Sequence, residues 1–404
     1  MAIDAIKSIR MKSEDENLFK MAKDLNTFWK KYTQQDLLII DDLADYDGAI
    51  NLIVDSDFDS LGEAYELEIK SDKISIKAES AEGVFRGIKT LEQIIVLSQL
   101  AGGSEFLSLP GGKINDHPYY EYRGAMLDVA RHFFSVTDVK RYIDILSIYK
   151  INFLHFHLSD DQGWRIEIKS RPKLTEIGGQ TEVGGGKGGF YTQEEFKEIV
   201  AYAAERFITI VPEIDLPGHT NAALASYANL NCNGKATKLY TGTEVGFSTL
   251  CVDKEETYEF VDDVIREISE MTPGPYFHIG GDEAKKTQWE NSSEIQELMK
   301  NLGIENVDSL QSYFTGRVER ILSENGKKLI GWDEIIEGGL NENAIVMSWR
   351  GEEGGITAVK AGNKAIMTPT SHMYFDYYQA KKDEPIAIGG LIDQEKVYTY
   401  EPVS

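Results

Sequence analysis

Residues 124–158 have the sequence GAMLDVARHFFSVTDVKRYIDILSIYKINFLHFHL, which predicts a strand, a helix and a second strand in succession. The apolar runs at 124–129 and 153–158 have the length of buried strands, and the segment 136–149 between them carries apolar residues at three- and four-residue spacing. Two strands joined by such a helix run parallel in one sheet, with a right-handed crossover. This stretch therefore decides the fold class, which is α/β.

The same alternation continues toward the C-terminus. Further strands are predicted at 208–214, 276–279, 328–331, 344–348 and 364–368, and further helices at 193–205, 254–271 and 309–325. Seven such units favour a (β/α)8 TIM barrel over an open sheet. No eighth strand is found before residue 404. The eighth unit is therefore expected to be missing from this chain, and a truncated barrel, an open barrel and completion by another element all stay open.

The residues before the barrel predict a small α+β domain. Helices are expected at 17–31 and 83–97, with a strand at 49–54. The alternating run 64–78 is interrupted at 70–73, which indicates a hairpin. A polar stretch with Gly and Pro at 109–118 is the expected boundary. We therefore assign residues 1–116 to the small domain and residues 117–404 to the barrel.

Charge and hydropathy narrow the classes of partner. The 42 basic and 67 acidic residues give a formal net charge of −25, which disfavours nucleic acid and anionic membranes as partners and leaves neutral ligands such as sugars. No apolar run of about 18 residues predicts a membrane span. The first twenty residues are too polar for a signal peptide, so the protein is expected to be cytoplasmic or to have lost a leader. Oligomeric state is left open.

The two cysteines, Cys232 and Cys251, are too few for a disulfide framework or a four-ligand zinc site. Two structural thiols in a loop region are the favoured interpretation. One disulfide closing that loop is the alternative.

Polar and aromatic side chains follow every predicted strand of the barrel. Because the chemistry of such barrels lies at the C-terminal ends of the strands, these residues are candidates for one site. They are Asp128, Arg131 and His132; His155, His157, Asp160, Asp161 and Trp164; Glu213, Asp215 and His219; His278, Asp282 and Glu283; Trp332, Asp333 and Glu334; Ser348, Trp349 and Arg350; and His372, Tyr374 and Asp376.

The adjacent acids Asp282 and Glu283 are the sharpest single signal. Hydrolysis of a glycosidic bond needs an acid at the leaving oxygen and a group that stabilises an oxocarbenium-like carbon. Neighbours on a strand point to opposite faces, so both can serve one site only where the strand ends. Gly280 and Gly281 supply such a break. The alternative is that Asp282 caps the next helix and Glu283 lies in its first turn.

Three other side chains suit a sugar ligand. Trp332 and Trp349 offer flat apolar faces for pyranose C–H groups, although either could be a core residue. Arg131 could donate to two vicinal hydroxyls with its rigid guanidinium, or it could form a salt bridge across the barrel.

Two further patterns are weaker. Residues 181–190, TEVGGGKGGF, resemble a phosphate-binding loop, but Lys187 is followed by Gly188 instead of Ser or Thr, so a mobile loop over the site is favoured. His155 and His157 share a strand face and could bind a metal. No third ligand on that face is evident from the sequence, so inward-facing barrel histidines are favoured, and no metal or cofactor is predicted.

Seven motifs in order resemble the β-N-acetylhexosaminidases of glycoside hydrolase family 20. They are MLDVARHF at 126–133, HFHLSDDQGWR at 155–165, GGGKGGFYTQEE at 184–195, VPEIDLPGH at 211–219, HIGGDE at 278–283, GWDE at 331–334 and SWRG at 348–351. The resemblance extends from about residue 122 to 403, and the preceding domain is similar to the small domain that precedes the barrel in this family.

The resemblance implies a retaining, substrate-assisted mechanism, in which the 2-acetamido oxygen of the substrate attacks the anomeric carbon and an oxazolinium ion forms. It implies that Glu283 protonates the leaving oxygen and then activates water, and that Asp282 orients the acetamido N–H. An intramolecular nucleophile held by a carboxylate gains effective molarity, so no enzyme nucleophile is needed.

The resemblance also implies roles for the other candidates. Arg131 is expected to bind the 3- and 4-hydroxyls, and Asp160 and His219 to form a polar network behind Glu283. Further residues are expected around the acetamido group: Trp332, Trp349, Tyr374 and Asp376. In the predicted strand register, however, Asp160 points away from His157 unless the strand has already ended. The Trp and Glu that the family carries on its eighth strand have no counterpart here.

Three functions are compatible with the sequence. The first is an exo-β-N-acetylhexosaminidase that removes terminal GlcNAc or GalNAc from oligosaccharides. The second is a non-catalytic carbohydrate-binding protein or an inactive fragment. The third is a metal-dependent hydrolase that uses His155 and His157. The first is the prediction, while the preferred sugar and linkage stay open.

Overall fold

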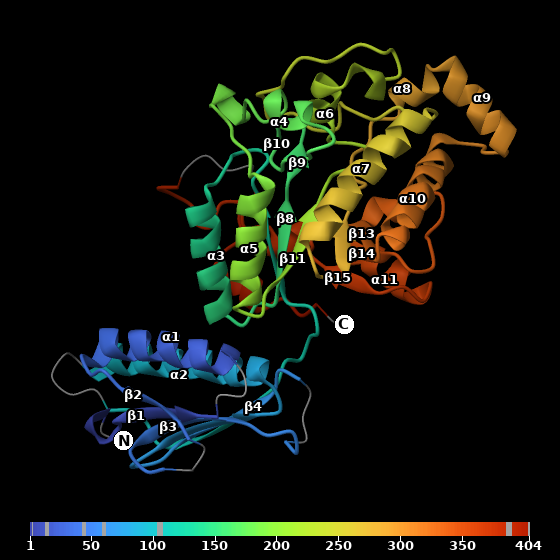
Figure 1. The fold of residues 1–404 in the computed structure, drawn as a ribbon. Helices are drawn as coiled ribbons and strands as arrows, with labels where there is room; N and C mark the ends of the chain where they lie inside the picture. The colour runs from blue at the N-terminus through green and yellow to red at the C-terminus, as the bar shows by residue number, and fades with distance from the viewer. Residues whose placement is uncertain are drawn as a thin grey trace. The chain divides into compact units, whose positions relative to one another are not determined.

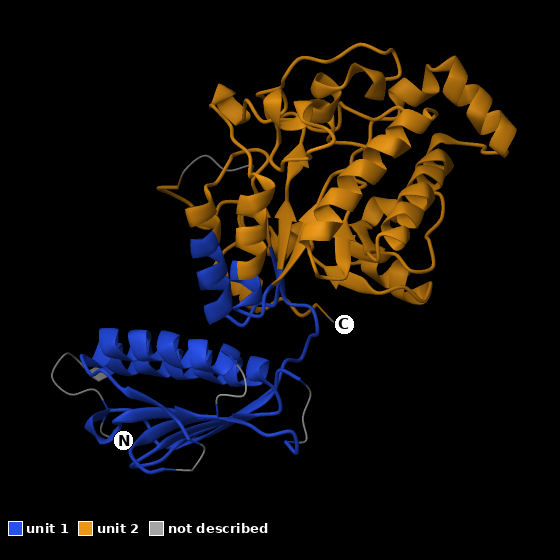
Figure 2. Ribbon diagram, in the orientation of Figure 1, with its two compact units in different colours: residues 1–125, 140–153, 202–208 blue, residues 126–139, 154–201, 209–404 orange. Residues whose placement is uncertain are grey.

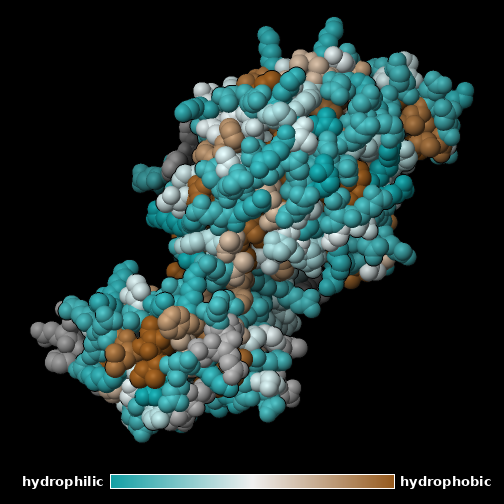
Figure 3. Space-filling model, in the orientation of Figure 1, coloured by the Kyte–Doolittle hydropathy of each residue, from teal (hydrophilic) through white to brown (hydrophobic). Residues whose placement is uncertain are grey.

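The computed structural model describes residues 1, 3–12, 16–42, 46–58, 62–102, 108–384 and 390–402. The chain divides into two compact units (Figure 2). The first contains residues 1–125, 140–153 and 202–208, and the second contains residues 126–139, 154–201 and 209–404. Among the described residues, no helix has both the length and the apolar character needed to cross a bilayer. The visible face of the molecule is mostly hydrophilic (Figure 3), in line with the many charged residues.

The first unit contains a six-stranded mixed sheet covered by two long helices (Figure 1). Its strand order is β2-β1-β3-β5-β4-β6. The elements are β1 (Ser8–Met11), α1 (Glu16–Thr33), β2 (Leu38–Asp41), β3 (Ala49–Val54), β4 (Tyr65–Ile69), β5 (Ile74–Ala78), α2 (Ala81–Gly102) and β6 (Gly112–Asp116), after a short 3-10 turn at Ile3–Ala5. Helix α1 buries one apolar stripe, formed by Leu18, Met21, Ala22, Leu25 and Trp29. The spacing of three or four residues between these positions is why this sequence forms an amphipathic helix.

The predicted hairpin is confirmed, since β4 and β5 pair antiparallel with Leu67 opposite Ile76. The amide of Lys70 donates to the carbonyl of Lys73 at 2.9 Å and closes the turn. The strands β1, β2 and β6 were not predicted. Strand β6 lies inside the polar stretch that was expected to be only a boundary, and it pairs antiparallel with β4. Most of its residues are exposed, so it carries no hydrophobic alternation that sequence analysis could detect.

The second unit is built around a seven-stranded sheet of order β15-β14-β13-β12-β11-β8-β7. All seven predicted strands are found. They are β7 (Gly124–Asp128), β8 (Phe153–His157), β11 (Thr209–Glu213), β12 (Tyr276–His278), β13 (Lys328–Trp332), β14 (Ile345–Ser348) and β15 (Ala365–Met367). Strands β11 to β15 pair in parallel, as the barrel prediction requires. The described residues thus supply seven strands of a (β/α)8-like barrel.

Helices follow most of these strands and lie around the outside of the sheet (Figure 1). The long ones are α3 (Val136–Ile148), α5 (Gln193–Ala204), α7 (Glu255–Met271), α9 (Ser293–Leu302), α10 (Val307–Glu324) and α11 (Glu353–Lys360). Short elements occupy the loops: α4 (Lys173–Glu176), α6 (Asn221–Ser226), α8 (Thr287–Glu290), α12 (Thr370–Met373), α13 (Gln394–Tyr398), the strand pair β9 (Ser159–Asp160) and β10 (Gly163–Trp164), and 3-10 turns at Val183–Gly185, Ala228–Leu230 and Asp333–Ile336. The loops at the C-terminal ends of the strands therefore carry their own structure, which is what positions side chains there.

The favoured interpretation of the cysteines was wrong. Cys232 and Cys251 form a disulfide, with their Cα atoms 4.8 Å apart. The bond closes a loop between α6 and α7, as the alternative interpretation of the two cysteines predicted. Proximity of two loop residues depends on how the loop folds back, and spacing alone does not reveal it.

Candidate active site

The turn after β12 brings Asp282 and Glu283 to the end of the strand. Gly280 and Gly281 have φ values of 68° and 102°, in the region that favours glycine. A Cβ atom on Gly280 would lie 1.8 Å from Oδ1 of Asp215. The next helix, α8, begins only at Thr287, so the helix-cap interpretation of the two acids was wrong. The glycine break predicted from the sequence is present, and it turns both acids out of the strand.

His219 joins the two acids. Its Nε2 atom lies 3.2 Å from Oε2 of Glu283 and 3.4 Å from Oδ2 of Asp282. His219 and Glu283 both have positive φ values, 51° and 45°, which cost energy for residues other than glycine. The side chain of Glu283 is 34% exposed while that of His219 is 1% exposed. Glu283 thus contacts the buried His219 while part of its side chain stays exposed, as a group that meets a ligand requires.

Asp160 lies behind His219 and connects it to Arg131. Its Oδ1 atom is 3.1 Å from Nδ1 of His219, and its Oδ2 atom is 2.9 Å from Nη2 of Arg131. Strand β8 ends at His157, so the chain has left the strand register before Asp160, and the two side chains meet at 2.8 Å. The expected conflict between their directions is therefore absent.

Arg131 makes the salt bridge that was its alternative role and still keeps an exposed part. Its Nη1 atom donates to Oδ2 of Asp128 at 2.9 Å. The side chain remains 30% exposed, so the guanidinium is fixed by two carboxylates, Asp128 and Asp160, while part of it faces outward. Such a fixed fork suits recognition of paired hydroxyls.

The charges of this network alternate. Burial disfavours the charged form of His219, yet Asp160, Asp282 and Asp215 outweigh it and raise the pKa of the imidazole well above its ordinary value. Burial also opposes ionisation of Asp160, but Arg131 and His219 outweigh it, so the pKa of Asp160 lies well below its ordinary value. Both shifts favour a positively charged His219 between ionised carboxylates.

Asp215, at the end of β11, completes the environment of Asp282. Burial and the neighbouring charge of Asp282 raise the pKa of Asp215 well above its ordinary value. Burial acts the same way on Asp282, but His219 outweighs it and the pKa of Asp282 is lowered. These opposite shifts favour a neutral Asp215 that can donate to an ionised Asp282. Asp215 was one of the strand-end candidates in the sequence, but no role in the reaction was predicted for it.

Aromatic side chains line the adjoining strand ends. Trp332 ends β13 and is 6% exposed, with its ring centroid 4.8 Å from that of His278. Trp349 follows β14, and its ring stacks with Tyr374 at 6.3 Å. Nε1 of Trp349 donates to Oε2 of Glu334 at 2.9 Å, which fixes the indole plane. Burial is the main reason that the pKa of Glu334 rises to about 8.

Tyr374 and Asp376 follow α12. Burial and nearby acids, Asp282 first among them, raise the pKa of Tyr374. Burial and Asp128 raise the pKa of Asp376, against the opposing charge of Arg131. Asp376 is exposed.

The glycine-rich loop at 181–190 is held in place by hydrogen bonds to neighbouring residues. The buried guanidinium of Arg165 donates to the carbonyls of Val129 at 2.9 Å, Thr181 at 2.8 Å and Gly189 at 3.0 Å. The amide of Val183 donates to the carbonyl of Arg131 at 2.9 Å. Arg165 was missed from the sequence, although a basic residue directly after a buried strand pair could have been suspected of a structural role.

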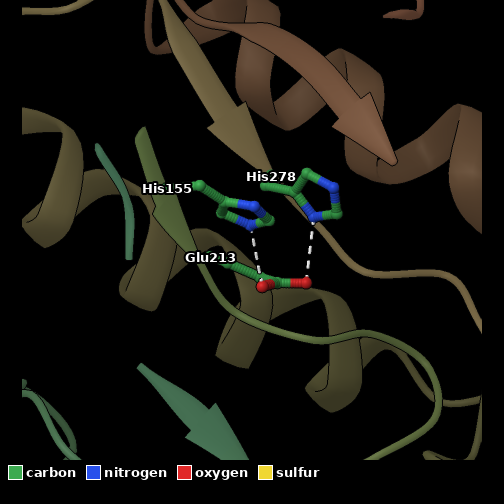
Figure 4. Close-up of side chains that lie close together, drawn as sticks. All are labelled: His155, Glu213 and His278. Carbon is green, nitrogen blue, oxygen red and sulfur yellow. Dashed lines mark ion pairs between the residues drawn. The ribbon is translucent and has the colours of Figure 1, made fainter. Parts of the chain in front are cut away.

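His155 has partners that the sequence did not reveal. Glu213, His278 and His155 lie together in the barrel interior (Figure 4) and could offer three metal ligands. Nε2 of His155 lies 2.8 Å from Glu213 Oε2, and Nδ1 of His278 lies 3.0 Å from Glu213 Oε1. Ligand atoms on one tetrahedral zinc ion lie about 3.3 Å apart. Both separations are shorter than this, so the three side chains pack more closely than ligands around a zinc ion would.

We therefore expect that metal removal leaves the protein's activity unchanged. Dialysis against a chelator, followed by initial-rate measurement with and without added Zn²⁺, checks this expectation. Loss of activity on chelation, with recovery on adding the ion, would instead support a metal-dependent hydrolase.

Comparison with known proteins gives consistent findings. The sequence matches the model described as glycosyl hydrolase family 20, catalytic domain, over residues 120–404, and that described as domain 2 of the same family over residues 2–117. A β-hexosaminidase of Porphyromonas gingivalis is 46% identical over 88% of this chain and 46% of the relative. A β-N-acetylhexosaminidase of Cellulomonas fimi is 38% identical over 87% of this chain and 67% of the relative. The chain thus spans about half the length of the first of these relatives.

Two solved structures are similar over nearly the whole chain. The β-N-acetylhexosaminidase of Streptomyces coelicolor has a TM-score of 0.86 and 39% identity, covering 100% of this chain and 78% of that one. A mutant β-hexosaminidase of Streptomyces plicatus in complex with the product GlcNAc has a TM-score of 0.84 and 40% identity, covering 98% of this chain and 77% of that one.

Proposed function

The chain belongs to glycosyl hydrolase family 20, and from this premise we propose that it is an exo-β-N-acetylhexosaminidase. It would remove terminal non-reducing β-linked GlcNAc or GalNAc from oligosaccharides, with retention of configuration. The observation that carries the proposal is the pair Asp282 and Glu283, which lies beyond a strand end beside the buried ring of His219. The GlcNAc bound to the similar Streptomyces plicatus enzyme supports the choice of sugar.

In the proposed first step, the acetamido carbonyl oxygen of the substrate forms a bond to the anomeric carbon. The bond from that carbon to the leaving oxygen breaks, and Glu283 gives its proton to the leaving oxygen. The ionised Asp282 accepts the acetamido N–H and stabilises the positive charge of the resulting oxazolinium ion. Asp215 and His219 hold Asp282 for this task through the contacts described above.

In the second step, water attacks the anomeric carbon and Glu283 takes a proton from it. The oxazolinium ring opens and the acetamido group is restored, so the product keeps the β configuration. Arg131 would bind the 3- and 4-hydroxyls. Trp332, Trp349 and Tyr374 would enclose the acetamido group, with Asp376 nearby. A fixed nucleophile inside the substrate gives high effective molarity, which explains why two carboxylates and no enzyme nucleophile suffice.

Initial rates on p-nitrophenyl β-N-acetylglucosaminide and on p-nitrophenyl β-glucoside test the proposal. We expect turnover of the N-acetyl substrate alone, and NMR of the first-formed product should show the β anomer. Equal turnover of both substrates, or an α anomer formed first, would overturn the mechanism. Sugar binding without turnover would favour the non-catalytic binding protein.

A further inference from the structure

A line of buried acid–imidazole contacts continues from the catalytic pair into the barrel. Behind Asp160, Nε2 of His157 lies 2.8 Å from Oδ2 of Asp160, and Nδ1 of His157 lies 2.5 Å from Oε2 of Glu213. His157 is 2% exposed and Glu213 is fully buried. The contacts therefore run without interruption from Glu213 to Glu283, through His157, Asp160 and His219.

His157 is positively charged in this arrangement. Each of its ring nitrogens faces a carboxylate oxygen, and a carboxylate can only accept, so both nitrogens must carry a proton. Burial opposes this charge, but Glu213 and then Asp128 outweigh it and raise the pKa of His157 well above its ordinary value. Asp160 is thereby placed between three cations, which are Arg131, His157 and His219.

Glu213 contacts side chains from both strands that neighbour its own. Strand β11, which carries it, lies between β8 and β12 in the sheet. Its two carboxylate oxygens contact His155 and His157 from β8 and His278 from β12. Nδ1 of His278 is in turn 3.0 Å from the amide nitrogen of Gly280, in the turn that presents the catalytic pair. Glu213 is thus linked through His157 to Asp160, and through His278 to the turn that carries Glu283.

We propose that Glu213 and His157 are positioning residues, which hold Asp160 so that Arg131 can bind the sugar and His219 can hold Glu283. The effect of these residues on turnover rests on the proposed function. Their effect on the position of Asp160 does not. Glu213 and His157 touch no substrate in this account. Their effect reaches the reaction only through Asp160.

The pH dependence follows from the groups that face His157. These are Asp128, Arg131, His155, Asp160, Glu213 and Asp215. Removing the charge of Glu213 takes away the largest favourable contribution to the protonated ring, so His157 will lose its proton at lower pH. Activity that needs the protonated ring is present below that pKa and lost above it. The alkaline limb of kcat/KM should therefore move to lower pH.

The kinetic test compares Glu213→Gln with Glu267→Gln. Glu267 is a second buried glutamate, which accepts hydrogen bonds from the backbone of Lys169 and Ser170 and has no part in the network. For Glu213→Gln we expect kcat to fall roughly 10²-fold with a smaller change in KM, and the alkaline limb to move by about one pH unit. Glu267→Gln should keep the wild-type pH profile. A folded Glu213→Gln variant with the wild-type profile would overturn the proposal.

A spectroscopic test needs no activity. In wild-type protein labelled with ¹⁵N in its 7 histidines, at least two rings should be doubly protonated at about pH 8, namely His157 and His219. His157→Gln should remove one of them, and Glu213→Gln should deprotonate the same one. Fewer than two such rings would overturn the proposal, even if neither variant folds. If wild-type protein hydrolyses no N-acetyl substrate, the proposed function fails while these spectra still decide the role of Glu213.

Discussion

Replacing Glu283 by Gln is expected to lower kcat for a β-linked GlcNAc disaccharide roughly 10³-fold, with little change in KM. The amide has nearly the shape of the carboxyl group and can keep the contact to His219, which lies 3.2 Å away. It has no proton to give to the leaving oxygen and cannot take one from water. Both steps of the proposed reaction therefore lose their acid or base while substrate binding is retained. Initial rates over a range of substrate concentrations separate the effect on kcat from the effect on KM.

Aryl leaving groups sharpen this test. A nitrophenolate leaves without protonation, so the first step of the variant should suffer less with such a substrate than with the disaccharide. Glu267→Gln serves as the matched control and should stay within a few-fold of wild type. If Glu283→Gln slowed both substrates equally and only through KM, Glu283 would be a binding residue and another acid would have to be found.

The sequence carried enough periodicity to predict the barrel strands and the turn that presents Asp282 and Glu283. Those strands are buried apolar runs, and Gly280 and Gly281 mark a conformation that few other residues adopt. Strands β1, β2 and β6 escaped prediction because they are short, and because β6 and β2 expose much of their surface. Such strands form because a neighbouring strand offers hydrogen bonds, which no local pattern records.

The roles of Glu213, Asp215 and Arg165 needed three-dimensional information. Glu213 and His157 are 56 residues apart, and nothing in their spacing says that they meet. One signal was available, since β8, β11 and β12 each end on an ionisable residue. Adjacent parallel strands bring their last residues to one level of a barrel, so these three side chains could have been placed together once the strand order was known.

Replacing Asp282 by Asn is expected to lower kcat on N-acetyl substrates by about 10²- to 10³-fold and to reduce the preference for these substrates over β-glucosides. The carboxylate is held ionised because His219 outweighs the effect of burial on its pKa, and because Asp215 donates to it. Asn removes the charge that would stabilise the oxazolinium ion. A lowered pKa keeps Asp282 charged at every pH above it, so the loss should be constant between about pH 5 and 8.

Asp333→Asn is the matched control. Asp333 is also a buried acid directly after a barrel strand, but its carboxylate accepts from Nε of Arg350 at 2.7 Å and makes no contact with His219 among the described interactions. It should keep the N-acetyl preference and a kcat within a few-fold of wild type. A similar loss in both variants would point to general damage of the strand ends. Full activity of Asp282→Asn would remove Asp282 from the reaction, because a neutral amide would then stabilise the oxazolinium ion as well as a carboxylate does.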